Sequence, residues 1–273
     1  MADLKNVSKF DQVMALSSTT FAFTICFAVW TIFAIIGVQI KQDLGLTETQ
    51  FSLLIGTPIL TGSIIRLTLG IWADQYGGRP ILLMVMISSA ISTWLLTYAE
   101  TYNMLLITAL GVGIAGGSFV VGISYLSKWY SKERQGTALG IYGMGNIGAA
   151  VTKFIAPFVM VAYGWHMVAQ VWAVALIMMA VLFWIFTKDE PQIQAQRASK
   201  ATPKSMWESL KPLKKLQVWR FSLYYFFVFG GFVALALWLP RYYVGVYDMD
   251  IKQAGMLAAS FSVAGSLFRA AGG

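Results

Sequence analysis

The chain has 273 residues and a formal net charge of +8, and 58% of its residues are hydrophobic while only 12% are charged, whereas soluble domains carry about 45–50% apolar and about 25% charged residues. A soluble core of this length could not bury 10 Trp, 12 Tyr and 18 Phe and still leave a wettable surface, so a membrane protein is the default class. A single cysteine and a single histidine exclude a disulfide framework and a metal centre built from these residues, and we expect no metal and no cofactor.

Apolar stretches long enough to cross the roughly 30 Å hydrocarbon core of a bilayer recur along the chain. The first, at about residues 14–38, is too long for the apolar region of a signal peptide and is interpreted as a spanning helix. We therefore predict an all-α membrane protein with seven spanning helices and part of an eighth. The further helices are predicted at about 48–72, between residues 79 and 100, between 100 and 128, from 134 to the break at 163–166, from that break to 187, between 220 and 241, and from about 253.

The longest connection carries three prolines among its charges and separates two membrane halves. We predict an N-terminal six-helix transmembrane half over residues 1–187 and a cytoplasmic inter-half loop over residues 188–217. The start of the second half, with helix seven and an incomplete helix eight, is predicted over residues 218–273. Because a half-finished helix would leave backbone groups unpaired in lipid, we expect the complete protein to continue beyond Gly273.

The basic residues determine the expected orientation, because cytoplasmic connections concentrate Lys and Arg. With the N-terminus inside, 14 basic residues fall in inner segments and 3 in outer ones, and the remaining 3 of the 20 lie within predicted helices. The basic surplus thus sets the topology, and nucleic acid is not an expected partner. We expect a monomeric protein that is embedded in lipid with its N-terminus in the cytoplasm.

An internal repeat relates two arginines on predicted helices two and eight. Residues 62–70 and 265–273 both match G-S-x-x-R-x-x-x-G. Helix eight is therefore expected to be the counterpart of helix two, in a protein with six helices in each half. The matched arginines, Arg66 and Arg269, are more informative than the glycines, which are common in this chain.

An arginine near mid-membrane costs about 2.5–3.5 kcal/mol on insertion and normally faces a bundle interior or an aqueous cavity. Pairing with a buried carboxylate would be one explanation, but all 12 acidic residues fall in predicted loops or at helix ends. We expect Arg66 and Arg269 to bind an anion. Structural pairing with a part of the protein beyond this sequence is the alternative.

The segment Gly70–Arg79, G-I-W-A-D-Q-Y-G-G-R, resembles the G-x-L-A-D-x-x-G-x-R loop between helices two and three of major facilitator superfamily transporters. It departs from that pattern at Trp72 and Gly78. The resemblance implies the fold of that superfamily, and a segment that latches the conformation instead of binding substrate. In this segment Asp74 can cap the inner end of a neighbouring helix, and adjacent glycines turn the chain tightly. The expected latch residues are Gly70, Asp74, Gly77 and Arg79.

The segment Gly143–Pro157 resembles the glycine-rich signature of the nitrate/nitrite porter family, and its T-K-F-x-A-P ending is similar to the branch of proton-coupled nitrate importers. In that family helices two and eight each supply one arginine to the nitrate, and aromatic residues sandwich the ion. Residues 225–230, Y-F-F-V-F-G, are similar to the family's Y-x-x-x-F-G on helix seven. The resemblance implies that substrate is bound by Arg66, Arg269, Asn146, Tyr225, Phe229, Phe119 and Phe33.

The matched residues also have purely structural explanations. Asn146 could form an interhelical hydrogen bond, and Tyr225 and Phe229 could pack in the core. Small side chains let membrane helices approach closely, and this role is compatible with a functional one. The expected helix-packing glycines are Gly140, Gly143, Gly145 and Gly148.

Coupling is the least determined part of the prediction. Nitrate entering against an inside-negative potential is opposed by about 2.3 kcal/mol per charge per 100 mV, so import needs co-transported cations or exchange for an outgoing anion. Lys153 is interpreted either as the group that carries a proton or as a fixed positive charge that attracts the anion. The branch resemblance favours the first role.

We therefore expect a secondary active transporter that moves nitrate, nitrite or both across the bacterial cytoplasmic (inner) membrane by alternating access, with protons co-transported. Nitrate/nitrite exchange and an organic-phosphate or carboxylate antiporter of the same superfamily are the alternatives. An enzyme or a receptor has little support, because the sequence contains no H-E-x-x-H and no G-x-S-x-G motif.

Overall fold

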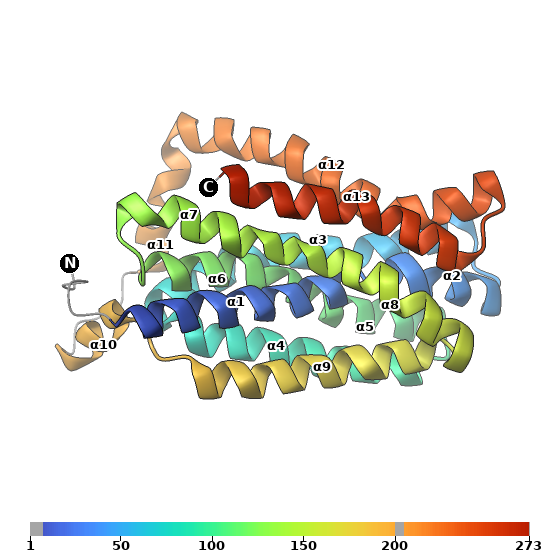
Figure 1. Ribbon diagram of the computed structural model, residues 1–273, viewed down its shortest axis with the longest axis horizontal. Coiled ribbons are helices and arrows are strands. Elements are labelled where there is room, and N and C mark those ends of the chain that lie inside the picture. Colours follow the sequence, from blue (N-terminus) through green and yellow to red (C-terminus); the bar gives the residue numbers. More distant parts are fainter. Residues whose placement is uncertain (1–7, 200–204, 273) are drawn as a thin grey trace.

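The protein is described by a computed structural model that covers residues 8–199 and 205–272. These residues form helices and no strand, and eight helical segments among them are long and apolar enough to cross a membrane. The helices lie side by side along the longest axis of the molecule (Figure 1). The predicted all-α membrane fold is confirmed. We call the end of the bundle where the first helix begins the proximal end, and the opposite end the distal end.

The first span is broken into α1 (Lys9–Trp30) and α2 (Phe33–Asp43), where the sequence predicts one helix at about 14–38. At the break the Thr31 hydroxyl donates to the carbonyl oxygen of Phe27 at 3.0 Å. A hydroxyl that bonds back to the preceding turn competes with the backbone ladder and commonly bends a helix. The span is also longer than predicted, because the alkyl stems of terminal lysines can lie along an apolar helix while their charges stay at the bilayer surface.

A spanning helix occupies each of the other predicted positions, with ends that differ by a few residues. Spans two to four are α3 (Glu48–Tyr76), α4 (Gly78–Leu95) with η2 (Leu96–Tyr98), and α5 (Tyr102–Val112) with η3 (Gly113–Gly117) and α6 (Ser118–Ser127). Spans five and six are α7 (Lys132–Gly143) with η4 (Met144–Ile147) and α8 (Gly148–Tyr163), and α9 (Trp165–Phe186). The long connection holds α10 (Pro191–Ala198), α11 (Met206–Ser209) and η5 (Lys211–Lys214), and the last two spans are α12 (Leu216–Tyr247) and α13 (Ile251–Gly272).

Glycines in η4 and α8 let α1 pack against them at backbone distance. A Cβ added at Gly148 would lie 2.0 Å from the carbonyl oxygen of Thr24, and one added at Gly145 would lie 2.4 Å from Cδ1 of Phe23. Any larger residue would therefore force the helices apart. Gly140 lies half-buried in α7, one turn before this contact.

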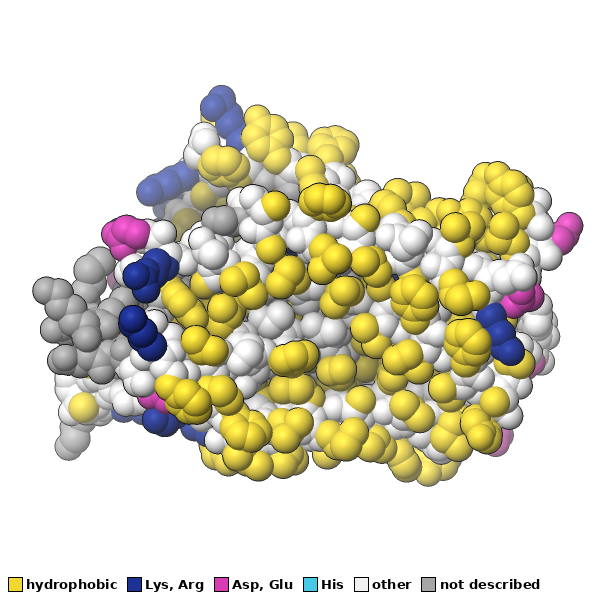
Figure 2. All heavy atoms as spheres, in the orientation of Figure 1, with side chains coloured by type: hydrophobic (Ala, Val, Ile, Leu, Met, Phe, Trp, Pro, Cys, Tyr) yellow, Lys and Arg dark blue, Asp and Glu magenta, His cyan; other side chains and the backbone are white. Residues whose placement is uncertain are grey.

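On the face that Figure 2 shows, hydrophobic side chains are spread along the length of the bundle, while charged side chains gather toward its two ends. Trp184, Phe226 and Phe268 are 54%, 67% and 76% exposed. An apolar belt of this extent needs lipid or further apolar protein around it. The protein is an integral membrane protein.

Candidate anion-binding site

Arg66 projects from α3 into a group of aromatic rings. Its Nε donates to the carbonyl oxygen of Gly116 at 2.9 Å. Its Cζ lies 5.1 Å from the ring centre of Trp30, 5.4 Å from that of Phe229 and 5.8 Å from that of Phe119. A guanidinium has five N–H donors in one plane. The bond to Gly116 orients this plane and leaves further donors for a ligand.

Arg269, on α13, contacts the Phe229 ring that Arg66 also contacts. Its Cζ lies 5.4 Å from the ring centre of Phe229 and 5.8 Å from that of Phe232. A Cβ added at Gly143 would lie 3.4 Å from Cδ of Arg269, so a glycine at this position leaves room for the arginine stem. Both guanidiniums thus lie 5.4 Å from the centre of the Phe229 ring. The two arginines of the repeat therefore face one residue at the interface between the predicted halves.

The repeat is also visible in how each arginine helix meets the span before it. A Cβ added at Gly62 would lie 2.7 Å from Nε1 of Trp30, and one added at Gly265 would lie 2.9 Å from Cε2 of Phe232. In both cases the glycine four residues before the arginine admits an aromatic ring, and the guanidinium lies over that ring. The G-S-x-x-R pattern therefore places an aromatic ring beneath each cation.

The predicted aromatic residues Phe119, Tyr225 and Phe229 form one stack. The Phe119 ring is nearly parallel to Phe229 at 6.2 Å and 12°, and to Tyr225 at 6.2 Å and 17°. Tyr225 and Phe229 lie 4.9 Å apart at 19°. Aromatic faces attract guanidinium groups, so Phe119 and Phe229 of this stack support Arg66, and Phe229 also supports Arg269.

Other aromatic residues of the site differ from those predicted. Phe33 is buried at the start of α2, and none of the ring contacts among the described residues joins it to either arginine. Trp30 and Phe232, which the sequence analysis does not select, lie beside the arginines instead. The repeat could have indicated these two residues, because its glycines leave room for an aromatic ring of the preceding span: Trp30 packs on Gly62, and Phe232 packs on Gly265.

Neither arginine has an acidic partner within the described part of the chain. The ion pairs among these residues do not involve Arg66 or Arg269. Arg66 instead lines a cavity of about 620 Å³ whose wall continues through Gly70 to Asp74 near the proximal end. Neither Arg269 nor a ring of the aromatic stack lines this cavity, and Asp74 does. The feature that suits a small anion is therefore the pair of guanidiniums over the Phe229 ring, which have no acidic partner among the described residues.

Asn146 lies fully buried in η4. Its Nδ2 donates to the carbonyl oxygen of Gly143 at 2.9 Å, while its Oδ1 has no hydrogen-bond partner among the described residues. A buried acceptor without a donor costs about 1–3 kcal/mol, and the amide has a second donor hydrogen. Asn146 therefore has unused hydrogen-bonding capacity beside the glycine that faces Arg269.

Lys153 is fully buried in α8, and its Nζ donates to Oγ of Ser262 at 2.6 Å. Ser262 lies on α13, the helix that carries Arg269, and was not selected from the sequence. The hydrogen bond therefore joins the two predicted halves. No ion pair among the described residues involves Lys153, so its charge is not neutralised by a neighbouring carboxylate there.

The predicted latch segment contacts α6 through Gly70 and Asp74. A Cβ added at Gly70 would lie 2.6 Å from Cγ1 of Val120, so glycine permits α3 to approach α6. The Asp74 carboxylate accepts a hydrogen bond from Oγ of Ser124 at 2.6 Å and lies 3.4 Å from Nζ of Lys128. Asp74 thus contacts side chains in and just after the last turn of α6. These contacts are not the helix cap that the sequence analysis expects, because the unpaired backbone groups at a helix C-terminus are carbonyl acceptors.

Gly77 and Arg79 complete the segment. Gly77 joins α3 to α4 with a φ of +103°, a conformation that favours glycine. Arg79 donates through Nη2 to the carbonyl oxygen of Trp184 at 2.7 Å, and its Nη1 lies 3.6 Å from Asp189. The segment therefore ties spans two and three to the end of span six.

Glu190 is a buried member of this network that the sequence analysis places in a charged connection. Its side chain is fully buried, and its Oε1 accepts from the backbone N–H of Gly78 at 2.6 Å and lies 3.6 Å from Nζ of Lys128. Burial raises the pKa of the Glu190 carboxyl, against the opposing effects of the Gly78 N–H and the Lys128 ammonium. The carboxyl is therefore held in a site that favours its protonated form.

We expect Glu190→Gln to raise the thermal midpoint of the full-length protein by about 2 °C or more near pH 8, and by less near pH 5. A carboxyl with a raised folded pKa stabilises fully below its unfolded pKa of about 4.3, and this contribution is lost as the pH rises through the folded pKa. Glutamine imitates the protonated carboxyl and keeps an acceptor for Gly78. Thermal unfolding in detergent measures the difference, with the exposed Glu208→Gln as control. If the thermal midpoint of the wild type rises relative to that of the Gln variant as the pH increases, pairing of the Glu190 carboxylate with Lys128 outweighs the cost of its burial.

A helical membrane protein whose sequence repeat places two arginines over one aromatic ring, between its predicted halves, falls in the class of transporters built from structural repeats. Residues 19–273 match the family described as Major Facilitator Superfamily. The chain belongs to this superfamily, as the resemblance of the latch segment predicts.

Within this superfamily, the chain is similar to curated proteins whose names refer to nitrate and nitrite. The chain is 40% identical over 275 residues to the "Probable nitrate/nitrite antiporter NarK1" of Thermus thermophilus, covering 96% of this chain and 61% of the relative. It is 32% identical over 263 residues to the "Nitrite extrusion protein" of Bacillus subtilis (strain 168), covering 96% and 65%. The chain thus spans about three fifths to two thirds of the length of these relatives. Both are named for transport and not for an enzymatic reaction, which agrees with the prediction that the protein is not an enzyme.

A solved structure supports the fold. The bacterial homolog to the human lysosomal transporter Spinster, in its inward-facing and unoccupied conformation, aligns with a TM-score of 0.74 at 20% sequence identity. The alignment covers 94% of this chain and 60% of that one. At this identity the likeness concerns the fold alone.

Proposed function

We propose that the full-length protein is a secondary active transporter that moves nitrate, nitrite or both by alternating access. Its place would be the bacterial cytoplasmic (inner) membrane, with the N-terminus and the proximal end in the cytoplasm. The main support for the proposal is that Arg66 and Arg269 both lie over the Phe229 ring. Neither arginine has an acidic partner among the described residues. The names of the relatives supply nitrate and nitrite as the candidate anions.

The shape of the site supports a planar oxyanion. Each guanidinium presents its donors in a fixed plane, and bidentate contacts to oxygen atoms are stronger and more specific than contacts to a point charge. The Phe119, Tyr225 and Phe229 stack would exclude water from the ion, which strengthens electrostatic contacts. Asn146 would add a neutral hydrogen-bonding group. We assign substrate binding to these residues and the two arginines, with Trp30 and Phe232 supporting the arginines from below.

For coupling we propose nitrate/proton symport that depends on Lys153. The support is its bond to Ser262, because the group that would hold the proton contacts the helix that carries one substrate arginine. Exchange of nitrate for nitrite is the second candidate, and it is favoured by the name of the Thermus thermophilus relative. In both modes a second ion compensates the charge of the incoming anion, so the inside-negative potential no longer opposes its entry.

The test of the substrate is uptake of labelled nitrate into proteoliposomes that contain the full-length protein. We expect uptake that unlabelled nitrate or nitrite suppresses and that an organic phosphate or a carboxylate leaves unchanged. Uptake of a labelled organic phosphate or carboxylate without nitrate uptake would reject the proposed substrate and retain only an anion transporter.

Asp74→Asn is expected to slow nitrate transport about tenfold while changing equilibrium nitrate affinity less than about twofold. Asparagine keeps an acceptor for Ser124 and loses the charge that faces Lys128, so it weakens a contact at the proximal end and leaves the arginines in place. Initial uptake rates and nitrate titration of the purified protein measure the two quantities. Glu133→Gln, an exposed position at the start of α7 that lines neither cavity, is the control. An affinity loss as large as that of Arg66→Lys would place Asp74 in the binding site.

A further inference from the structure

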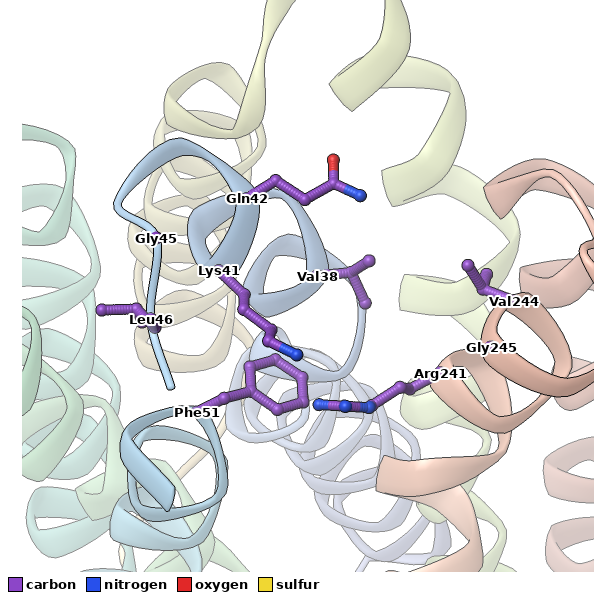
Figure 3. Close-up of a pocket in the computed structure, with 9 residues that line it drawn as sticks. All are labelled: Val38, Lys41, Gln42, Gly45, Leu46, Phe51, Arg241, Val244 and Gly245. Atoms are coloured by element: carbon purple, nitrogen blue, oxygen red, sulfur yellow. The ribbon is translucent and has the colours of Figure 1, made fainter. Parts of the chain in front are cut away.

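A second cationic cavity lies at the distal end of the bundle. Its volume is about 450 Å³, and it is enclosed by α2, the start of α3 and the distal part of α12 (Figure 3). Its polar walls come from Lys41, Gln42 and Arg241, and none of the acidic side chains that the structure describes lines it. The cavity therefore combines two positive charges and an amide with no negative charge on its surface.

The two cations share one aromatic ring. Cζ of Arg241 lies 4.4 Å from the ring centre of Phe51, and Nζ of Lys41 lies 5.6 Å from it. Figure 3 shows both side chains pointing toward this ring, Lys41 from α2 and Arg241 from α12. Phe51 itself is fully buried, so the ring is a fixed support. Two cations on one buried phenylalanine repeat the arrangement of Arg66 and Arg269 on Phe229.

Glu48 holds the two cations from outside the cavity. Its carboxylate forms ion pairs with both Lys41 and Arg241, so one negative charge offsets only one of the two positive charges. Nη1 of Arg241 is buried and has no hydrogen-bond partner among the described residues. A buried charged donor without an acceptor is unfavourable. The cavity therefore offers both a net positive charge and an unused donor.

We propose that this cavity is a second anion site, in which Lys41, Arg241 and the amide of Gln42 take up a small inorganic oxyanion at the distal mouth. The identity of the ion rests on the proposed function, whereas the charge and the free donor do not. Glu48 keeps the site weak, because it cancels one of the two charges. An ion that must move on to a next site has to be bound weakly enough to leave.

The same residues allow a purely mechanical explanation. Because Glu48 lies on α3 and Arg241 on α12, their ion pair joins the two predicted halves and could serve only to close the distal end. The two explanations predict different changes in nitrate affinity when Glu48 and Arg241 are neutralised one at a time. An anion site gains affinity when Glu48 loses its charge and loses affinity when Arg241 does, whereas a closing contact is broken equally by either change.

The deciding experiment is nitrate titration of the purified full-length protein by calorimetry, in an Arg66→Lys background that weakens the central site, with ionic strength held constant by sodium gluconate. We expect Glu48→Gln to tighten the remaining nitrate binding about threefold or more, and Arg241→Gln to weaken it by a similar factor. Lys41→Gln should also weaken binding, and because Lys41 and Glu48 belong to the same half, this variant leaves the contact between halves intact. Thermal unfolding of each variant checks that it is folded.

Opposite shifts for Glu48→Gln and Arg241→Gln, with Lys41→Gln following Arg241→Gln, would support the distal anion site. Shifts in the same direction, or no shift with any variant, would overturn it. Failure of the wild type to take up nitrate in proteoliposomes would reject the proposed function separately, because the distal site is measured here by binding and not by transport.

Discussion

Replacing Arg66 by lysine is expected to weaken nitrate binding about 10- to 100-fold, although the positive charge is retained. Arginine presents a planar fork of donors, whereas the lysine ammonium is a compact point charge. In the structure the bond from Nε of Arg66 to Gly116, at 2.9 Å, orients this fork beside the Phe229 ring. A lysine could not keep the bond to Gly116 and at the same time offer two parallel donors to the ion.

Equilibrium binding of nitrate to the purified full-length protein measures this loss. Arg269→Lys should reduce affinity to a similar extent, because the repeat places both guanidiniums on the same ring. Arg197→Lys is the matched control, since Arg197 is paired with Asp189 at the proximal surface and lies outside the site. Wild-type affinity in Arg66→Lys would refute the assignment of the site.

Hydropathy alone predicted the number and order of the spans, because each stretch is apolar over a length that only a membrane requires. It could not predict the break between α1 and α2, since Thr20 and Thr24 form the same hydroxyl bond to the preceding turn as Thr31 and leave α1 unbroken. Hydropathy also could not predict where the helices end. Lys9 and Lys41 lie inside the helices, and a pattern based on charge alone stops before such residues.

The arginines of the site were predictable because the repeat marks positions that hydropathy disfavours. The aromatic residues came from the resemblance, and the structure brings only part of them to Arg66: the rings of Phe119 and Phe229 contact it and Tyr225 stacks on those two rings, whereas none of the ring contacts among the described residues joins Phe33 to it. Their role in binding stays a prediction. Which of many aromatic residues on a helix faces the site depends on how that helix is rotated in the bundle, which hydropathy does not specify. Glu190 shows a further limit, since its burial depends on how a connection folds back against the loop at Gly78.

The two roles proposed for Lys153, a proton carrier and a fixed positive charge, can be separated by experiment. Lys153 is fully buried, and its polar contact is the bond to Ser262 at 2.6 Å. A neutral amine can still donate to that hydroxyl, so the lysine can release its proton without losing this contact. Arginine, by contrast, stays protonated in proteins. The pair of variants Lys153→Gln and Lys153→Arg therefore separates a proton carrier from a fixed positive charge.

We expect both variants to reduce nitrate uptake driven by an imposed pH gradient about tenfold or more, because glutamine carries no proton and arginine does not release one. The measurement is initial nitrate uptake into proteoliposomes without internal nitrite, with the exposed Lys132→Gln as the matched control and thermal unfolding as a check on the larger arginine side chain. Full uptake in the folded Lys153→Arg protein would assign Lys153 the fixed-charge role. Wild-type uptake that ignores the gradient, and appears only when nitrite is loaded inside, would reject symport in favour of exchange, since an outgoing anion would then balance the charge of the incoming nitrate.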